Sequence, residues 1–193
     1  MIAKILSPMS ALATGLVLAG CAATQSPGFR KMSAIDHEHA AQYGADATGA
    51  TSSEHREAAQ QLREAEHLAC AEVPDADRDL GPFARRDRIV GIEAVRDRVY
   101  PKASPQLFGV NVTIRATPGV TEQWIGRVID CHVAHYAVVG VDVAPPPSPV
   151  LVHGATVQVF STADGFRVSI TSKDIDVARE VLRAGRALVA TAS

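Results

Sequence analysis

The segment ATVQVFSTADGFRVSIT, residues 155–171, carries the clearest structural signal in this chain. Apolar and polar residues alternate on both sides of Asp164-Gly165, and most of the apolar ones are β-branched or aromatic, which is typical of half-buried strands. An Asp-Gly pair readily adopts the positive backbone angles of a tight hairpin turn. The segment therefore predicts two antiparallel strands, over Ala155–Ser161 and Phe166–Thr171.

Two further strand-like runs precede this hairpin, and a helical run follows each pair of strands. The strand runs are Ile89–Val99 and Leu107–Ala116, and the helical runs are about Gly119–Val139, ended by Gly140, and about Ile175–Val189. The predicted order is thus β-β-α-β-β-α. Two strand pairs with one helix each would build a mostly antiparallel sheet with helices on one face, so we expect a two-layer α+β sandwich over residues 82–193.

The two halves of this region share a short pattern, because Val112-Thr113-Ile114 can be aligned with Val168-Ser169-Ile170. The match is compatible with an internal duplication without establishing one. A proline-rich stretch at 145–149 joins the halves, and prolines make a segment stiff and extended. We interpret this stretch as a spacer, with a recognition segment as the alternative.

A mostly polar helix is predicted ahead of the domain, over residues 52–73. Thr51-Ser52-Ser53-Glu54 has the spacing of a capping box, strong helix formers follow, and Pro74 ends the run. The apolar stripe is thin, which favours a helix on the surface of the core. Residues 21–51 are rich in small and polar residues and cannot bury enough surface to offset the entropy of ordering. We therefore expect a flexible tether there.

The first 20 residues have the features of a secretory signal peptide. Lys4 gives a short positive start, and the apolar run up to Gly20 is too short to span a bilayer comfortably. Leu18-Ala19-Gly20-Cys21 closes this run and resembles the lipobox of bacterial lipoproteins. The resemblance implies cleavage before Cys21, lipidation of that cysteine and attachment to a membrane, because each buried methylene of an acyl chain contributes about 0.8 kcal/mol.

Ala22 stands where the inner-membrane retention signal of that class has Asp, so the resemblance implies an outer-membrane location facing the periplasm.

The formal net charge is −2 and the pI is about 6.4. Nucleic-acid binding requires a basic patch, so we expect no nucleic-acid partner. Alternating acidic and basic residues between Asp75 and Arg98 are typical of a solvated surface. We interpret Asp75–Asp79 as a turn rich in carboxylates, with a weak calcium site as the alternative.

The cysteine count predicts a disulfide. Once Cys21 carries lipid, Cys70 and Cys131 are the two cysteines that remain. In a protein exported to an oxidising compartment, an even pair usually forms a disulfide. Closing a loop of about 60 residues would stabilise the fold by roughly 4 kcal/mol on chain-entropy grounds. His132 and His135, which face inward on the helix with Cys131, would then be core histidines with hydrogen-bond partners.

A metal site is one alternative use of the same cysteines, and free or intermolecular thiols are another. Cys131 and His135 are four residues apart on one helix, and His67 and Cys70 are three apart on the earlier one. Thiolate and imidazole ligands together suit zinc or copper. A copper site could also recruit His37-Glu38-His39 from the tether. The two cysteines cannot be a disulfide and metal ligands at the same time.

The sequence indicates no catalytic residues, because phosphate-binding loops, nucleophile elbows and His-Glu-x-x-His are all missing from it. The stretch Ala69–Asp79, followed by Pro82-Phe83, resembles segments of uncharacterised exported proteins of proteobacteria, and this resemblance implies no activity. We expect a lipid-anchored envelope module that binds a protein or a small ligand. The alternatives are a periplasmic copper- or zinc-binding lipoprotein and, behind it, an envelope hydrolase.

Overall fold

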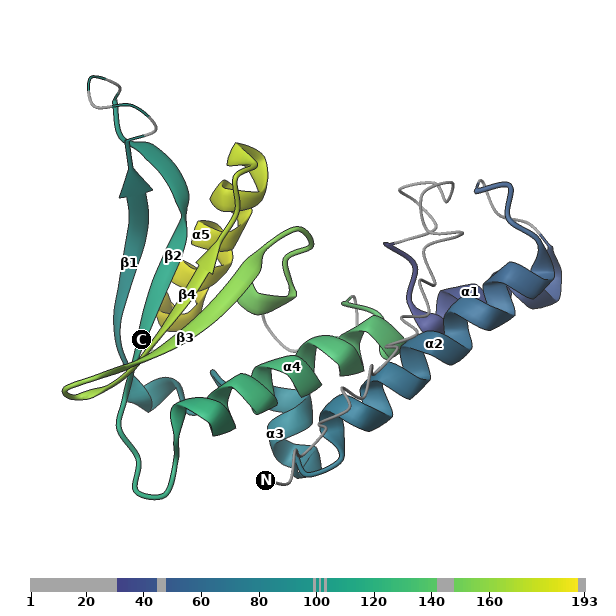
Figure 1. The fold of residues 1–193 in the computed structure, drawn as a ribbon, viewed down its shortest axis with the longest axis horizontal. Helices are drawn as coiled ribbons and strands as arrows, with labels where there is room; N and C mark the ends of the chain where they lie inside the picture. Colours follow the sequence, from purple (N-terminus) through teal and green to yellow (C-terminus); the bar gives the residue numbers. More distant parts are fainter. Residues whose placement is uncertain are drawn as a thin grey trace, which may run out of the picture.

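A computed structural model describes residues 31–44, 48–98, 100, 102, 104–141 and 148–190. The predicted signal peptide, the lipobox cysteine Cys21 and most of the proline-rich stretch lie outside these residues. The described part is a mixed α+β structure with five α-helices and one four-stranded antiparallel sheet, which confirms the predicted class (Figure 1). None of its helices is long and apolar enough to cross a membrane.

The elements follow one another in an order that starts with three helices. They are α1 (Ala34–Tyr43), α2 (Ser52–Cys70), α3 (Asp75–Leu80), β1 (Ile89–Asp97), β2 (Gln106–Arg115), α4 (Glu122–Val139), β3 (Thr156–Thr162), β4 (Gly165–Thr171) and α5 (Ile175–Ala190), with short 3-10 turns η2 (Arg86–Arg88) and η4 (Pro149–Leu151). The four strands, α4 and α5 lie where the sequence pattern predicts them, with ends displaced by a few residues.

The strands are ordered β1-β2-β4-β3, so that β2 and β4 form the centre of the sheet and β1 and β3 its edges. Every neighbouring pair is antiparallel. The central register places Val112 opposite Val168, the two residues that the alignment of the halves equates. The pairing of β1 with β2 is interrupted by two register shifts, one between Ile89 and Gly91 and one between Val95 and Arg96.

The main core lies between the sheet and α5, which packs chiefly against β2. Alternate residues of the two central strands are fully buried: Val110, Val112, Val168 and Ile170. Gly185 lets α5 approach the sheet closely, because a Cβ atom there would lie 3.1 Å from the side chain of Val110.

The helix α4 contributes to the main core at one end and to smaller clusters with the N-terminal helices at the other. Its N-terminal half adds Ile125 and Ile129 to the main core under the sheet. Its C-terminal half leaves the sheet and packs against α2, with α1 and α3 alongside (Figure 1). There Val138 joins Ala34 and Ala59 in a second, smaller cluster. The three N-terminal helices are therefore attached to the sheet domain through α4.

The helix α1 corrects the expectation of a tether that is flexible throughout residues 21–51. Ser33 caps the helix through a reciprocal capping box with Asp36, and Gly44 ends it in the left-handed conformation. Its buried residues are Ala34, His37 and Ala40. Two alanines and a histidine give almost no hydrophobic periodicity, so composition alone indicated disorder.

The helix α3 replaces the turn expected at Asp75–Asp79. Pro74 precedes its first residue, and the backbone N–H of Gly81 donates to the carbonyl of Asp77 at its end. A helix of six residues has too few turns to show an apolar stripe. The neighbouring α2 ends at Cys70, a little before the predicted end at residue 73.

Candidate functional site

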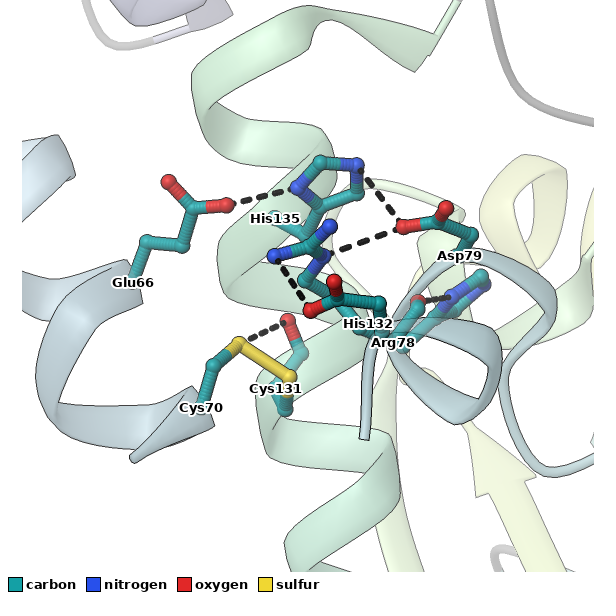
Figure 2. The surroundings of a disulfide bond; sticks show 8 residues. Glu66, Cys70, Arg78, Asp79, Cys131, His132 and His135 are labelled. Carbon is teal, nitrogen blue, oxygen red and sulfur yellow. Dashed lines mark hydrogen bonds and ion pairs between the residues drawn. A yellow bond between two sulfur atoms is a disulfide. The ribbon is translucent and has the colours of Figure 1, made fainter. Parts of the chain in front are cut away.

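The predicted disulfide is present and joins α2 to α4 (Figure 2). Cys70 is the last residue of α2, and its Cα atom lies 4.7 Å from that of Cys131, which is 61 residues further along the chain. Cys131 is fully buried and packs with Val73 and Val128. The bond therefore fixes the end of one helix against the middle of another.

Two side chains of α4, the one directly after Cys131 and one about a turn beyond it, hold the C-terminal end of α3. The ring atom Nδ1 of His132 lies 2.8 Å from the carbonyl oxygen of Arg78, and the hydroxyl of Tyr136 donates to the carbonyl of Asp79 at 3.1 Å. Carbonyls in the last turn of a helix lack an intrahelical partner. Because a carbonyl only accepts, Nδ1 of His132 carries the proton. The two side chains thus donate the hydrogen bonds that these carbonyls cannot accept from within α3.

Burial shifts the pKa of both side chains. Removal from water lowers the pKa of His132, although its hydrogen bond to the Arg78 carbonyl acts in the opposite direction. Burial likewise raises the pKa of Tyr136. Gly81 packs directly against the imidazole, since a Cβ atom there would lie 2.8 Å from ring atoms of His132, and its φ of +65° also favours glycine. His132 is therefore a core histidine with a hydrogen-bond partner, as the disulfide interpretation expected.

His135 lies between carboxylates of two other helices (Figure 2). Its Nδ1 is 2.6 Å from Oε1 of Glu66 in α2, and its Nε2 is 3.6 Å from Oδ1 of Asp79 in α3. The side chain is 16% exposed. The ring therefore links α2, α3 and α4 near the surface. The disulfide joins two of these helices, α2 and α4, in the interior beside it.

The alternative metal ligands do not converge on one site. Cys70 and Cys131 are bonded to each other, His67 is exposed on α2, and His135 contacts Glu66. Within the residues that the structure describes, no three His, Cys, Asp or Glu side chains are arranged to hold a metal ion. Sulfurs joined in a disulfide cannot act as thiolate ligands. The proposed set is thus not assembled in the disulfide-bonded protein.

The three residues His37-Glu38-His39 also separate. Glu38 pairs with Arg63, and His39 packs against Tyr43. His37 instead meets His55 of α2 in the interior, with 2.9 Å between their Nδ1 atoms. One ring must donate and the other accept. Sequence reasoning missed this pair because α1 was not expected.

Two hollows flank the N-terminal half of α4. One, of about 170 Å³, is termed the arginine pocket and is lined by Asp77, Gly81, Pro82, Ala84, Arg85, Arg88, Ile114, Arg115, Thr117, Val120, Trp124, Ile125, Val128 and Phe166. The other, of about 270 Å³, is termed the β3 groove and is lined by Glu122, Gln123, Gly126, Ile129, Asp130, Val157 and Val159. The first combines three arginines and Asp77 with apolar side chains, whereas the charged residues of the second are both carboxylates.

Neither hollow was predicted, because each gathers side chains from elements far apart in the sequence. The arginine pocket combines residues of α3, η2, β2, α4 and β4, and only the folded sheet brings them together. Comparisons of the chain with protein-family models, with curated proteins and with solved structures found no match.

Proposed function

We propose that this protein is a lipid-anchored module of the cell envelope that faces the periplasm from the outer membrane and binds a small ligand or a partner protein. The lipobox resemblance at Cys21 supports the anchor. The disulfide between Cys70 and Cys131 supports export, because disulfides form and persist in oxidising compartments. Residues 82–193 would be the binding unit, a β-β-α-β-β-α two-layer sandwich, with the preceding helices joining it to the lipidated end.

The arginine pocket is the observation that carries the binding part of this proposal. It opens between α4 and the ends of β2 and β4, and its lining combines apolar side chains with convergent charged groups. Concave, mostly apolar sites with a few placed polar groups are the usual form of ligand sites. The disulfide and the contacts of His132 and Tyr136 hold α3 and α4, the helices that supply part of the lining.

Replacing Cys21 by Ala tests the anchor. We expect the wild-type protein, expressed in a Gram-negative host, to stay with the membrane fraction and to incorporate labelled palmitate. The Cys21→Ala variant should lose both properties while its disulfide remains intact, since Cys70 and Cys131 are unchanged. Full membrane retention of the variant would contradict the lipid anchor.

Alkylation separates this proposal from periplasmic copper or zinc binding through His67, Cys70, Cys131 and His135. The protein is denatured and treated with a thiol reagent, with and without prior reduction. We expect Cys70 and Cys131 to react only after reduction, because a disulfide sulfur is not nucleophilic. Reaction of both without reduction would favour the metal-binding alternative and make His67 and His135 the residues to mutate.

A further inference from the structure

We propose that the arginine pocket binds a small organic monoanion, a carboxylate carried on a single flat apolar ring. The inference rests on the proposed function, and it specifies the class of ligand that the module would take. Three properties of the pocket lead to this class: its floor, its volume and its charge.

The floor of the pocket selects an apolar body. We use this name for the apolar lining residues that are buried or partly buried, which include Ile114, Trp124, Ile125, Val128 and Phe166. These side chains offer no hydrogen-bond acceptor, and only the indole N–H of Trp124 can donate. A polar ligand body would lose its hydration there without compensation. A flat ring would gain by packing against Trp124 and Phe166.

The volume limits the size of that body. The pocket measures about 170 Å³. An engineered protein cavity of about 150 Å³ accepts benzene. The arginine pocket therefore has room for one ring and a short substituent, and a long acyl chain would extend into solvent.

The rim supplies the charge. Arg85 and Arg88 share one carboxylate, Asp87, at 3.4 and 3.6 Å. Arg115, at the end of β2, makes no ion pair with any described residue and is exposed. The carboxylate of Asp77 also lines the pocket. Three guanidinium groups and these two carboxylates leave one excess positive charge, which a monoanion would neutralise.

Guanidinium groups suit a carboxylate in particular, because their planar donors can bind both of its oxygens. The β3 groove on the other flank of α4 provides the contrast within the same molecule. It is larger, but its charged lining residues are Glu122 and Asp130, both acidic. An anion should therefore enter the arginine pocket and avoid the β3 groove.

The chain contains one tryptophan, and it lies in the arginine pocket. The indole N–H signal of Trp124 in a nitrogen-correlated NMR spectrum thus reports on this site alone. Full-length protein, from whichever fraction contains it, is titrated with benzoate, with benzyl alcohol and with acetate. We expect saturable shifts with benzoate and a dissociation constant on the order of 1 mM, as suits so few atoms. Benzyl alcohol and acetate should each bind at least about fivefold more weakly than benzoate. Benzyl alcohol lacks the carboxylate, and acetate lacks the ring.

Three variants test the charge. Arg115→Gln should weaken benzoate binding about threefold to tenfold. Asp77→Asn should strengthen it, because a competing negative charge is removed. Arg186→Gln, exposed on α5 and outside the pocket, should leave it unchanged. The dispersion of the remaining signals verifies that each variant is folded.

Absence of any benzoate-dependent shift would overturn the inference, and so would equal affinity for benzyl alcohol or equal effects of Arg115→Gln and Arg186→Gln. None of these results bears on the anchor, because membrane retention and palmitate labelling depend on Cys21. Conversely, a protein that is not lipidated could still bind benzoate. The two proposals therefore fail separately.

Discussion

The helices α4 and α5 each follow a pair of strands, yet they are held in different ways. α5 packs on the sheet with an apolar face that includes Val181, Leu182 and Leu188. α4 gives the sheet only its first half, and its second half is fixed to α2 and α3 by a disulfide and by hydrogen bonds from His132 and Tyr136. Helical periodicity thus identifies an inward face without identifying the partner that covers it.

Removing the disulfide should have the largest effect on stability, and it should affect α4 and α5 differently. The Cys70→Ala/Cys131→Ala variant should lose about 4 kcal/mol of unfolding free energy on chain-entropy grounds. Urea denaturation measures the loss. Hydrogen exchange should show that α2, α3 and the second half of α4 lose protection before α5 does. The reduced wild-type protein serves as the control and should behave like the variant. Equal loss of protection in α5 would contradict the division of α4 between the sheet and the N-terminal helices.

A cavity under α5 tests the other half of the comparison. Ile170→Ala removes a fully buried side chain from the centre of β4 and should cost about 3 kcal/mol, the usual range for such truncations being about 2 to 5. Val90→Ala on β1, where the side chain is 50% exposed, is the matched control and should cost less than about 1 kcal/mol. Comparable urea midpoints for the two variants would mean that the main core is not where the structure places it.

A smaller loss is expected at the end of α3. Tyr136→Phe leaves the ring in place and removes the donor to the Asp79 carbonyl, so we expect a cost of about 1 kcal/mol in urea denaturation. Tyr100→Phe is the control, because Tyr100 is 70% exposed. If the two variants are equally stable, the hydrogen bond of Tyr136 contributes nothing to the joint.

The smallest effect concerns pH. Burial lowers the pKa of His132 in the folded protein below its ordinary value of 6.5. At pH values between the pKa of His132 in the folded protein and that in the unfolded chain, the unfolded chain binds more protons. The stability that depends on neutral His132 is therefore complete above about pH 7 and declines as the pH falls toward the folded pKa. His132→Asn keeps a donor near the Nδ1 position and cannot titrate. It should lose less stability than wild type between about pH 7 and about pH 5, measured as the shift of the urea midpoint.

The exposed His153 provides the matching control for this slope. His153→Asn makes the same exchange at an exposed position away from the joint of α3 and α4, and its urea midpoint should follow the wild-type dependence on pH. If the urea midpoint of His132→Asn changes with pH as that of the wild type does, the buried ring does not cause the loss of stability at low pH.

Local signals were sufficient for much of the fold. The capping box at Thr51 and Glu54 is present in the structure, and the strands on both sides of Asp164 pair as their alternation predicts. α1 carried a comparable signal in Ser33, Asp36 and Gly44. It was missed because its few buried residues are small or polar, so the helix has no apolar stripe.

The candidate sites were less predictable, because their chemistry depends on neighbours that are distant in the sequence. Counting cysteines was enough to pair Cys70 with Cys131. Periodicity also placed His132 inward, but the acceptor of its hydrogen bond is a backbone carbonyl of α3, which has no signature in the sequence. Likewise, Arg115 and Trp124 share a pocket only because the end of β2 lies beside α4 in the folded domain.

The edge strand β1 has a consequence for how copies of the protein behave beside one another. Lipid anchoring would concentrate them on a surface, where an open strand edge could recruit a neighbour and start aggregation. The two register shifts in β1 distort its ladder, and Glu93, Arg96 and Asp97 place charge along the strand. Both features oppose the addition of a foreign strand, so crowded copies should remain separate at this edge.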